Sequence, residues 1–542
     1  MGNYIDLLSG IFDTEQCIRY LKGIWENDRF FDYKSFAKTA DYCANAMADI
    51  GLDQVEKLAV AADGKTAYGD WVLPQAWDVE SAVLREVNNG ASLTAGSNCS
   101  SDAWVLADYA TTPCSLVMYS AKTPPGGITA ECIMVDDLDK VTPEQAKGKL
   151  LFTGLPAPEV AKFAQEAGAA GIVSDYMRMY PGIRDSRKQL YDTSIWVNNF
   201  CVPINNTGLF AFSLSPRNGD KLRARLTAGE SITLHAEVNT RAYDGEAYVV
   251  SGLIPGETDE EFCFYGHLYE PGAHDNASGC AAILELARCL NAAIKSGAIP
   301  KPKLSMRFIM GPECSGSMAY FTKHTNRKYR AGIVLDMVGT QSIDNAVLCI
   351  WHNPMSNVSL IDALAVAAIE DYAAKHGHFD WKSSRFSIGT DNILSDPCFG
   401  MPSFAMIAEP ALSYHSSFDT PDRIEPDVIK RNGVMAGACA LSMAYDEKGF
   451  GRACRVYKRK VMGCLTFDNR PDLQAKWQPA WNGHLNIPLF WMDGKRTIWE
   501  VAQLAASELR IDDVVAYFNE ICEYAEFLQS EGYIELWKTD KS

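Results

Sequence analysis

Apolar runs and helical segments alternate regularly between residues 246 and 450. The short apolar runs that predict buried strands lie at 248–254, 262–267, 304–310, 331–338, 346–351 and 402–408. The intervals between them have room for helices, for example 280–294 and 359–375. Unbroken apolar strands that alternate with helices are typical of a parallel sheet covered on both faces. The pattern therefore predicts an α/β fold with a mainly parallel sheet sandwiched by helices.

The N-terminal half of the chain predicts two further regions. Residues 1–84 contain a helical pattern at 36–50 that stops at Gly51 and is followed by a strand, so we assign them to the N-terminal part of the same α/β domain. Residues 85–245 consist mainly of short β-like runs separated by turns, with one clear helix at 158–167. We expect a separate β-rich domain there, inserted into the α/β domain.

Residues 451–542 predict a small helical domain. It begins with a basic cluster at 452–460 and contains two helical stretches, 497–509 and 512–530, with a possible β-ribbon at 533–537. Two helices and a ribbon would form a winged-helix-like domain. From Thr497 onward the sequence has ten acidic and three basic residues, whereas a surface that binds phosphates should be positive. We therefore expect this domain to pack against the rest of the chain or to form the contacts of a homo-oligomer.

Composition excludes several classes of protein. The chain has 542 residues, 47% of them hydrophobic, and a formal net charge of −18, which indicates several well-packed domains and opposes binding to nucleic acid. Its 16 cysteines are scattered, as in a reducing compartment. The first residues lack the pattern of a signal peptide, and no apolar run approaches the ~20 residues of a membrane span. We expect a cytoplasmic protein that does not bind membranes.

Metal-ligating side chains follow the ends of predicted strands. The five candidates are His267, Asp275, Glu313, Asp336 and His415. Taken singly, each has an ordinary explanation, since a histidine can cap a strand and Asp275 could N-cap the next helix. In a parallel sheet, however, these strand ends share one edge, so the five side chains are expected to converge. Two imidazoles and three carboxylates suit one or two zinc ions.

Zinc in such a site performs amide hydrolysis. It polarises a carbonyl and lowers the pKa of a water molecule to about 7. A free carboxylate can then take the proton from that water. Two zinc ions ~3.5–4 Å apart would need one carboxylate to bridge them.

The motifs resemble those of the co-catalytic zinc aminopeptidase family, typified by leucyl aminopeptidases, glutamate carboxypeptidase II and the transferrin receptor. The resemblance covers residues 246–445 and rests on His267, the segments 275–279 and 336–339, Glu313, and the segment 414–422. Residues 85–245 resemble the protease-associated domain that is often inserted in this family. The whole layout is similar to that of a poorly characterised aminopeptidase-like subgroup that ends in a winged helix.

The resemblance implies a zinc-dependent aminopeptidase that hydrolyses N-terminal residues of short peptides or peptide-like amides through a metal-activated water. It implies that Asp275 bridges two zinc ions, that His267 and Asp336 complete one site, and that His415 with a glutamate completes the other. Glu313 would be either the general base or a ligand. The substrate's free α-ammonium needs a carboxylate, for which Asp391, Asp396 and Glu409 are candidates.

Two departures from the family pattern widen the alternatives. Tyr269 stands where the family has the acid of a His-x-Asp motif, and Glu313 is followed by Cys314 instead of a second glutamate. The centre could therefore hold one zinc ion or two. An altered single-zinc amide or acyl-transfer enzyme on the same fold, or a catalytically inactive binding protein, remain the alternative functions.

Overall fold

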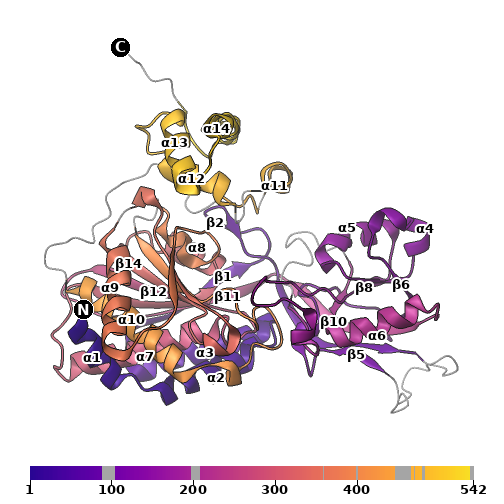
Figure 1. Cartoon of the computed structure of the whole chain (residues 1–542), viewed down its shortest axis with the longest axis horizontal. Helices are drawn as coiled ribbons and strands as arrows, with labels where there is room; N and C mark the ends of the chain where they lie inside the picture. Colours follow the sequence, from indigo (N-terminus) through magenta and orange to yellow (C-terminus); the bar gives the residue numbers. More distant parts are fainter. Residues whose placement is uncertain are drawn as a thin grey trace.

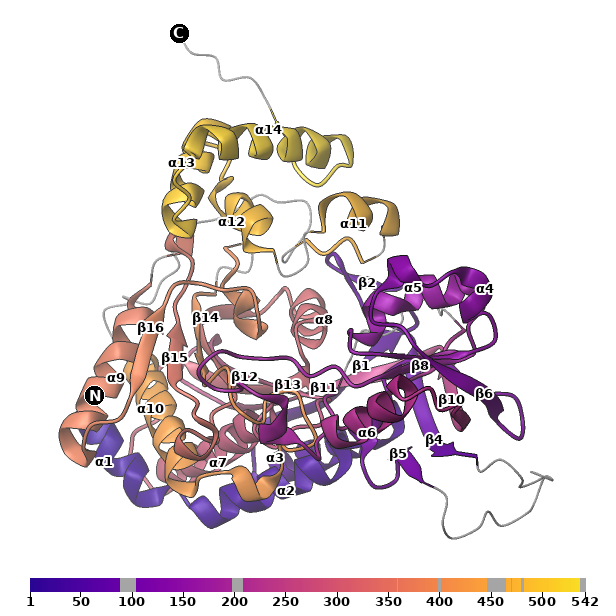
Figure 2. The same cartoon turned by 45° about the vertical axis from the view of Figure 1, so that its right-hand side comes forward.

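The structure is a computed structural model. It describes residues 1–87, 104–196, 208–357, 359–397, 401–445, 465–468, 470–478 and 482–536. The basic cluster at 452–460 lies outside these ranges. Figures 1 and 2 show a large α/β part, a second part built on its own sheet, and a group of C-terminal helices above the first.

An eight-stranded sheet organises the α/β part. Its strand order is β1-β11-β13-β12-β14-β17-β15-β16. The strands are β1 (Asp53–Ala62), β11 (Gly245–Ile254), β12 (Glu260–Leu268), β13 (Ser305–Pro312), β14 (Lys328–Asp336), β15 (Leu348–Trp351), β16 (Trp381–Ser384) and β17 (Ser403–Ile407). The predicted strands are thus confirmed, and β16 is an addition. The four central strands, β13, β12, β14 and β17, are parallel, whereas β11 runs antiparallel to β1 and β13, and β15 runs antiparallel to β17.

Apolar side chains of the central strands alternate between the two faces of this sheet. Phe262 and Phe264 belong to the core on one face, and Cys263 and Tyr265 to the core on the other, as the two-residue period of a strand requires. The first core is covered by α1 (Gly2–Ile11), α2 (Thr14–Asp28), α3 (Tyr33–Ile50), α7 (Ala277–Lys295) and α10 (Pro426–Ala444). Helix α9 (Leu360–His376) also packs there, beside α10.

The opposite face is covered by helices from two parts of the chain. Helix α8 (Ser315–Lys323) follows β13 directly. Residues of α12 (Gly483–Trp491), α13 (Ile498–Leu509) and α14 (Val514–Ser530) complete the same apolar core. The C-terminal helices are therefore part of the packing of the eight-stranded sheet. One described helix, α7, is long and apolar enough to cross a membrane, but 83% of that apolar stretch is buried inside the protein.

The second sheet is formed by seven strands that lie between β1 and β11 in the sequence, in the order β5-β4-β10-β6-β7-β8-β9. They are β4 (Ala76–Glu86), β5 (Val105–Asp108), β6 (Ile128–Met134), β7 (Leu150–Thr153), β8 (Gly171–Ser174), β9 (Ala211–Ser213) and β10 (Thr233–Tyr243). Helices α4 (Pro143–Ala146), α5 (Ala157–Ala167) and α6 (Pro216–Thr227) pack beside it. Strand β4 belongs to this sheet although it begins before residue 85, the predicted start of the insert.

The C-terminal region departs from the predicted winged helix. The described residues between 465 and 536 form α11 (Pro471–Trp477) and α12–α14 without any strand. In the described part of the predicted ribbon, the Tyr533 hydroxyl donates to Asp70 at 2.9 Å and the Leu536 N–H to the Gln529 side chain at 2.6 Å. These contacts hold the segment against α14 and the N-terminal part of the chain, so it does not pair as a ribbon. Trp537 lies outside the described residues.

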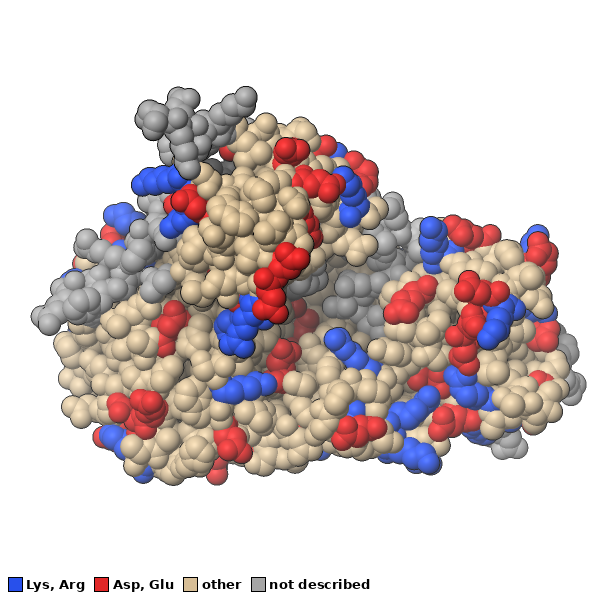
Figure 3. All heavy atoms as spheres, turned by 45° about the horizontal axis from the view of Figure 1, so that its top comes forward, with Lys and Arg blue, Asp and Glu red and all other residues tan. Residues whose placement is uncertain are grey.

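Charged side chains of both signs are interspersed over the face of the molecule shown in Figure 3. Many charged side chains of the described residues form ion pairs, such as Arg225 with Glu86 and Arg470 with Asp472. The pair of Arg470 and Asp472 is exposed to solvent and therefore contributes little stability.

Candidate metal centre

The five predicted ligands converge at one edge of the sheet. His267 lies near the end of β12 and Asp336 ends β14, and both side chains are nearly fully buried. His267 Nε2 lies 3.2 Å from Asp336 Oδ1 and 3.6 Å from Asp275 Oδ1. His415 Nε2 lies 3.3 Å from Asp275 Oδ2. The two oxygens of the Asp275 carboxylate therefore face two different imidazoles, as in a carboxylate that bridges two metal ions.

Glu313 joins this group from the turn after β13. One of its oxygens, one nitrogen of His267 and one oxygen of Asp336 all lie within 4.8 Å of one another. Donor atoms at such separations can share one cation. Glu313 is half-buried, so it is placed either to hold a metal or to exchange a proton beside it.

The Asp-Asn-x-Ser-Gly segment explains how Asp275 is presented. Asn276, and not Asp275, is the N-cap of α7, because its side chain accepts from the Gly279 N–H at 2.9 Å. Asn276 also donates to the Leu335 carbonyl and accepts from the Met337 N–H. These bonds attach the start of α7 to the end of β14. The carboxylate of Asp275 is thus left free to face the histidines.

Glycine is required in this segment because the two backbones approach closely. A Cβ on Gly279 would lie 2.1 Å from the Leu335 carbonyl oxygen. The loop is held from its other side by Asp419, whose carboxylate accepts from the backbone N–H groups of His274 and Asp275 at 2.6 and 3.0 Å. The Asp419-Thr-Pro-Asp segment of the sequence therefore positions the Asp275 loop.

Glu270 belongs to the centre but was not among the predicted ligands. This residue is 9% exposed, and its Oε2 lies 3.7 Å from His267 Nδ1. Donor atoms of His267, Glu270 and Asp275 form a second group within 4.8 Å. The sequence signal that could have identified Glu270 is the presence of an acidic residue three positions after His267. The family pattern instead places the acid two residues after the histidine, where this chain has Tyr269.

Tyr269 serves packing. Its ring contacts those of Phe31, Tyr33 and Phe36, with centroids 5.5, 4.8 and 5.0 Å away. Its backbone N–H donates to the buried carboxylate of Asp28 at 3.0 Å. The N-terminal helices therefore support the loop behind His267 and hold the residues on either side of Tyr269 in place.

The electrostatics of the centre fit a divalent cation. Burial raises the pKa values of Glu270 and Glu313 well above their usual range, and the neighbouring carboxylates raise them further. Burial would also raise the pKa of Asp275, but its contact with His415 and the nearby His267 lower it to about 2. Buried carboxylates this close to one another need protons or a cation between them. Imidazole and carboxylate donors of this kind are ligands of zinc.

The imidazole of His267 likewise requires a proton or a bound cation. Burial alone would lower its pKa, but the carboxylates of Asp336, Glu270 and Glu313 together raise it. Its Nδ1 is buried without a hydrogen-bond partner among the described residues. A buried, unsatisfied nitrogen surrounded by acids is costly unless a proton or a metal ion is supplied.

Of the three carboxylates considered for the substrate's ammonium group, two are fully buried. Asp391 accepts from the Cys314 N–H at 2.8 Å and from the Ser317 hydroxyl at 2.7 Å, so it positions the turn that carries Glu313. Asp396 is 0% exposed. Glu409 is half-buried, and burial together with Asp336 and Asp275 raises its pKa to about 7. Glu409 is therefore the candidate that remains accessible beside the centre.

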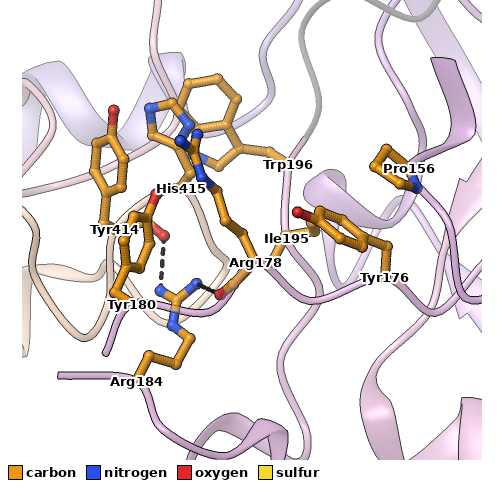
Figure 4. A pocket seen from close by; sticks show the side chains of 9 residues that line it. All are labelled: Pro156, Tyr176, Arg178, Tyr180, Arg184, Ile195, Trp196, Tyr414 and His415. Carbon is orange, nitrogen blue, oxygen red and sulfur yellow. Dashed lines mark hydrogen bonds between the residues drawn. The ribbon is translucent and has the colours of Figure 1, made fainter. Parts of the chain in front are cut away.

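A cavity of about 160 Å³ lies beside His415. Figure 4 shows that most of its walls come from the second sheet's part of the chain, with Arg178 extending to the same side as Trp196 and His415. The complete lining is Pro156, Tyr176, Arg178, Tyr180, Arg184, Ile195, Trp196, Tyr414 and His415. The cavity thus combines aromatic walls with two guanidinium groups.

The insert is attached directly to the loop that carries His415. The Trp196 ring lies against the His415 ring, with centroids 3.9 Å apart, and the Trp196 backbone N–H donates to the His415 carbonyl at 3.1 Å. Buried Arg184 donates to the carbonyls of Leu412 and Tyr414. Any movement of the insert would therefore change the position of a candidate metal ligand.

Comparison with known proteins agrees with this architecture. Residues 249–440 match the model of Peptidase family M28. A putative peptidase from Clostridium acetobutylicum is similar over 99% of both chains, with a TM-score of 0.56 and 17% identity. BSAP, a zinc aminopeptidase from Bacillus subtilis, has a TM-score of 0.56 and 17% identity over 82% of this chain and 99% of its own. A Peptidase M28 precursor from Shewanella amazonensis has a TM-score of 0.52 and 16% identity over 82% of this chain and 98% of its own.

No curated protein matches the chain. At identities of 16–17%, the solved structures establish the fold, and the family match covers the strands and loops that carry His267, Asp275, Glu313, Asp336 and His415. The α/β domain that holds the candidate metal centre is therefore similar to Peptidase family M28 over residues 249–440, and it shares its fold with a zinc aminopeptidase and a Peptidase M28 precursor.

Proposed function

We propose that this protein is a zinc-dependent aminopeptidase that removes N-terminal residues from short peptides or peptide-like amides. The observation that carries the proposal is the position of Asp275, whose two carboxylate oxygens face His267 and His415 at 3.6 and 3.3 Å. The proposed ligands are His267, Asp275, Asp336 and His415, with Glu313 beside them. BSAP is a zinc aminopeptidase with the same fold, which supports the choice of metal and reaction.

Zinc bound there would act as a Lewis acid on the scissile carbonyl and make water more acidic. The residues of the chain do the rest. Glu313, half-buried beside His267 and Asp336, takes the proton from the attacking water and passes it to the leaving amine. Burial raises the pKa of Glu313, and a bound cation would bring it back towards the range in which a base works.

Glu409 is proposed to bind the α-ammonium group of the substrate. It is the accessible carboxylate of the three candidates, and its pKa is sensitive to Asp336 and Asp275. The cavity beside His415 would hold the remainder of the substrate, because it adjoins the centre and is lined by aromatic side chains that pack well on a peptide.

The test is hydrolysis of a panel of amino-acid anilides and of the same compounds with an acetylated amino group. We expect turnover of the free amines alone, loss of turnover with a chelator, and recovery with zinc. Glu313→Gln should lower turnover roughly 10²–10⁴-fold while zinc remains bound.

Other results would redirect the assignment. One zinc ion without peptide turnover would favour the single-zinc amide or acyl-transfer enzyme. Turnover of acetylated substrates equal to that of free amines would contradict an aminopeptidase. Loss of zinc in Glu313→Gln would make Glu313 a ligand.

A further inference from the structure

We propose that Trp196 of the insert is a positioning residue for the metal ligand His415, and that zinc binding on the side of His415 depends on this contact. The inference rests on the proposed zinc function and deepens it, because it gives the insert a part in building the metal centre. Three features of the structure support it: the exposure of His415, the rings on either side of its imidazole, and the backbone contacts that hold both residues in place.

His415 differs from His267 in how its ring is held. The side chain of His267 is 1% exposed, whereas that of His415 is 31% exposed. Metal-ligating histidines usually donate the N–H of their other ring nitrogen to a hydrogen-bond partner, which fixes the orientation of the ring. Apart from its contact with Asp275, the His415 ring forms no hydrogen bond with any of the described residues. In the described part of the chain, packing is therefore what orients this imidazole.

Two aromatic rings enclose the imidazole of His415. The centroid of the Trp196 ring lies 3.9 Å from that of His415 and the centroid of the Tyr414 ring lies 3.8 Å from it, and each ring is inclined by 32°. Figure 4 shows Tyr414 on one side of His415 and Trp196 on the other. Rotation of the imidazole would displace one of these rings, so the Nε2 atom of His415 stays directed at Asp275, 3.3 Å away.

The backbone of His415 is held by the same segment of the insert. Its φ angle is +53°, in the left-handed region that residues other than glycine rarely adopt. The Trp196 N–H donates to the His415 carbonyl at 3.1 Å, and the Ser417 N–H donates to the Ser194 carbonyl at 2.8 Å. Together the two hydrogen bonds form an antiparallel bridge between the insert and the loop of His415. The insert therefore fixes the unusual conformation from which the imidazole is presented.

Trp196 is itself anchored by ring contacts and not by a hydrogen bond of its indole. The residue is 3% exposed, and its Nε1 has no hydrogen-bond partner among the described residues. A buried tryptophan N–H usually has a partner, so the contacts of this ring must offset the cost of burying it. The Phe31 ring contacts Trp196 edge-on with centroids 5.2 Å apart, and it also contacts Tyr269. Phe31 therefore supports the aromatic side chains next to both histidine ligands.

The test is calorimetric titration of the metal-free, full-length wild type and its variants with zinc. We expect Trp196→Leu to bind zinc about 10–100-fold more weakly in the step that His415→Ala weakens, with any other step unchanged. Trp196→Phe, which keeps a ring against the imidazole, should recover most of the affinity. Trp104→Leu is the matched control and should bind like the wild type, because Trp104 is a half-buried tryptophan of the same insert that does not line the cavity beside His415.

A double variant separates positioning from a general structural effect. In the His415→Ala background, Trp196→Leu should leave the remaining zinc affinity unchanged, because Trp196 acts only through His415. Unchanged zinc affinity of Trp196→Leu alone, or the same loss with and without His415, would overturn the inference. If His415→Ala retains no measurable zinc, equal losses in Trp196→Leu and Trp196→Phe would overturn it. A wild type that binds no zinc would contradict the proposed function instead, which is a distinguishable result.

Discussion

At the scale of single residues, the centre depends on a division of roles between Asp275 and its neighbour. Asn276 makes three hydrogen bonds with the backbone: one caps α7, and the other two join the start of α7 to the end of β14. Asp275 is thereby spared from capping and faces both histidines. If the aspartate stood at position 276, one of its carboxylate oxygens would be occupied by capping α7. The order of Asp275 and Asn276 therefore matters for metal binding.

Asp28 gives a pH-dependent prediction at this scale. It accepts from Thr39 at 2.6 Å and from the Tyr269 N–H at 3.0 Å, yet burial raises its pKa from 3.8 to about 7. The folded protein therefore binds a proton there that the unfolded chain releases near pH 4, so the stability contributed by this proton is full below that pH and is lost as the pH rises through about 7.

The metal-free wild type should accordingly lose more stability between pH 5 and pH 8 than Asp28→Asn does. We expect a difference of about 1–3 kcal/mol in the free energy of unfolding. Urea unfolding at the two pH values measures it. An equal loss in both proteins would show that Asp28 is ionised in the folded state at pH 5.

The sequence predicted five residues of the centre but not Glu270. Strand ends can be located from apolar runs, and parallel strands bring their ends together, so His267, Glu313 and Asp336 followed from pattern alone. The path of the 268–274 loop does not follow from pattern. It depends on contacts with α2, α3 and Asp419, which lie far away in the sequence.

At the scale of secondary structure, the pattern predicted strands better than it predicted their directions. Strands β11 and β15 have the same apolar runs as the parallel strands, yet both pair antiparallel with neighbours. Direction is decided by how each connection crosses the sheet, and the chain between β1 and β11 forms a separate part with its own sheet. Apolar periodicity carries no information on such connections.

Arg178, a residue that the insert contributes to the cavity, gives a prediction about substrate recognition. Among the described residues it forms no ion pair, and it lines the cavity with Trp196 and His415. Its guanidinium is placed to receive a carboxylate of the substrate. Arg178→Gln should raise the KM for a dipeptide with a free carboxyl group about tenfold, and leave the KM for the matching dipeptide amide unchanged.

Lys188→Gln is the matched control, because Lys188 is exposed on the same insert and does not line the cavity. A dipeptide with an acidic side chain and an amidated end distinguishes a side-chain carboxylate from a C-terminal one. Equal effects of Arg178→Gln on all the substrates would contradict recognition of a carboxylate.

At the scale of the whole molecule, the C-terminal helices and the N-terminal part are joined through Asp70. This residue is 2% exposed and accepts from the N–H groups of Thr466 and Phe467 at 2.7 and 2.8 Å, and from the Tyr533 hydroxyl at 2.9 Å. The same contacts explain why residues 533–536 do not form the predicted ribbon. The local pattern of apolar and polar residues carries no information on such long-range hydrogen bonds.

Asp70→Ala should therefore loosen the C-terminal helices. It removes the acceptor for two buried backbone donors, which costs roughly 2–4 kcal/mol. Limited proteolysis should cut the variant faster than the wild type in the region after residue 445. Asp49→Ala, a change at an exposed aspartate of α3, should be cut at the wild-type rate, and equal rates in all three proteins would contradict this role for Asp70.

The most direct test of zinc-dependent function is the zinc content per chain of the wild type and of Asp275→Asn, measured on samples purified without chelators together with their hydrolysis of an amino-acid anilide. We expect bound zinc and turnover in the wild type. We expect loss of zinc and of turnover in Asp275→Asn, because the carboxylate between His267 and His415 is removed. A wild type that binds no zinc even when zinc is supplied would contradict the proposed function.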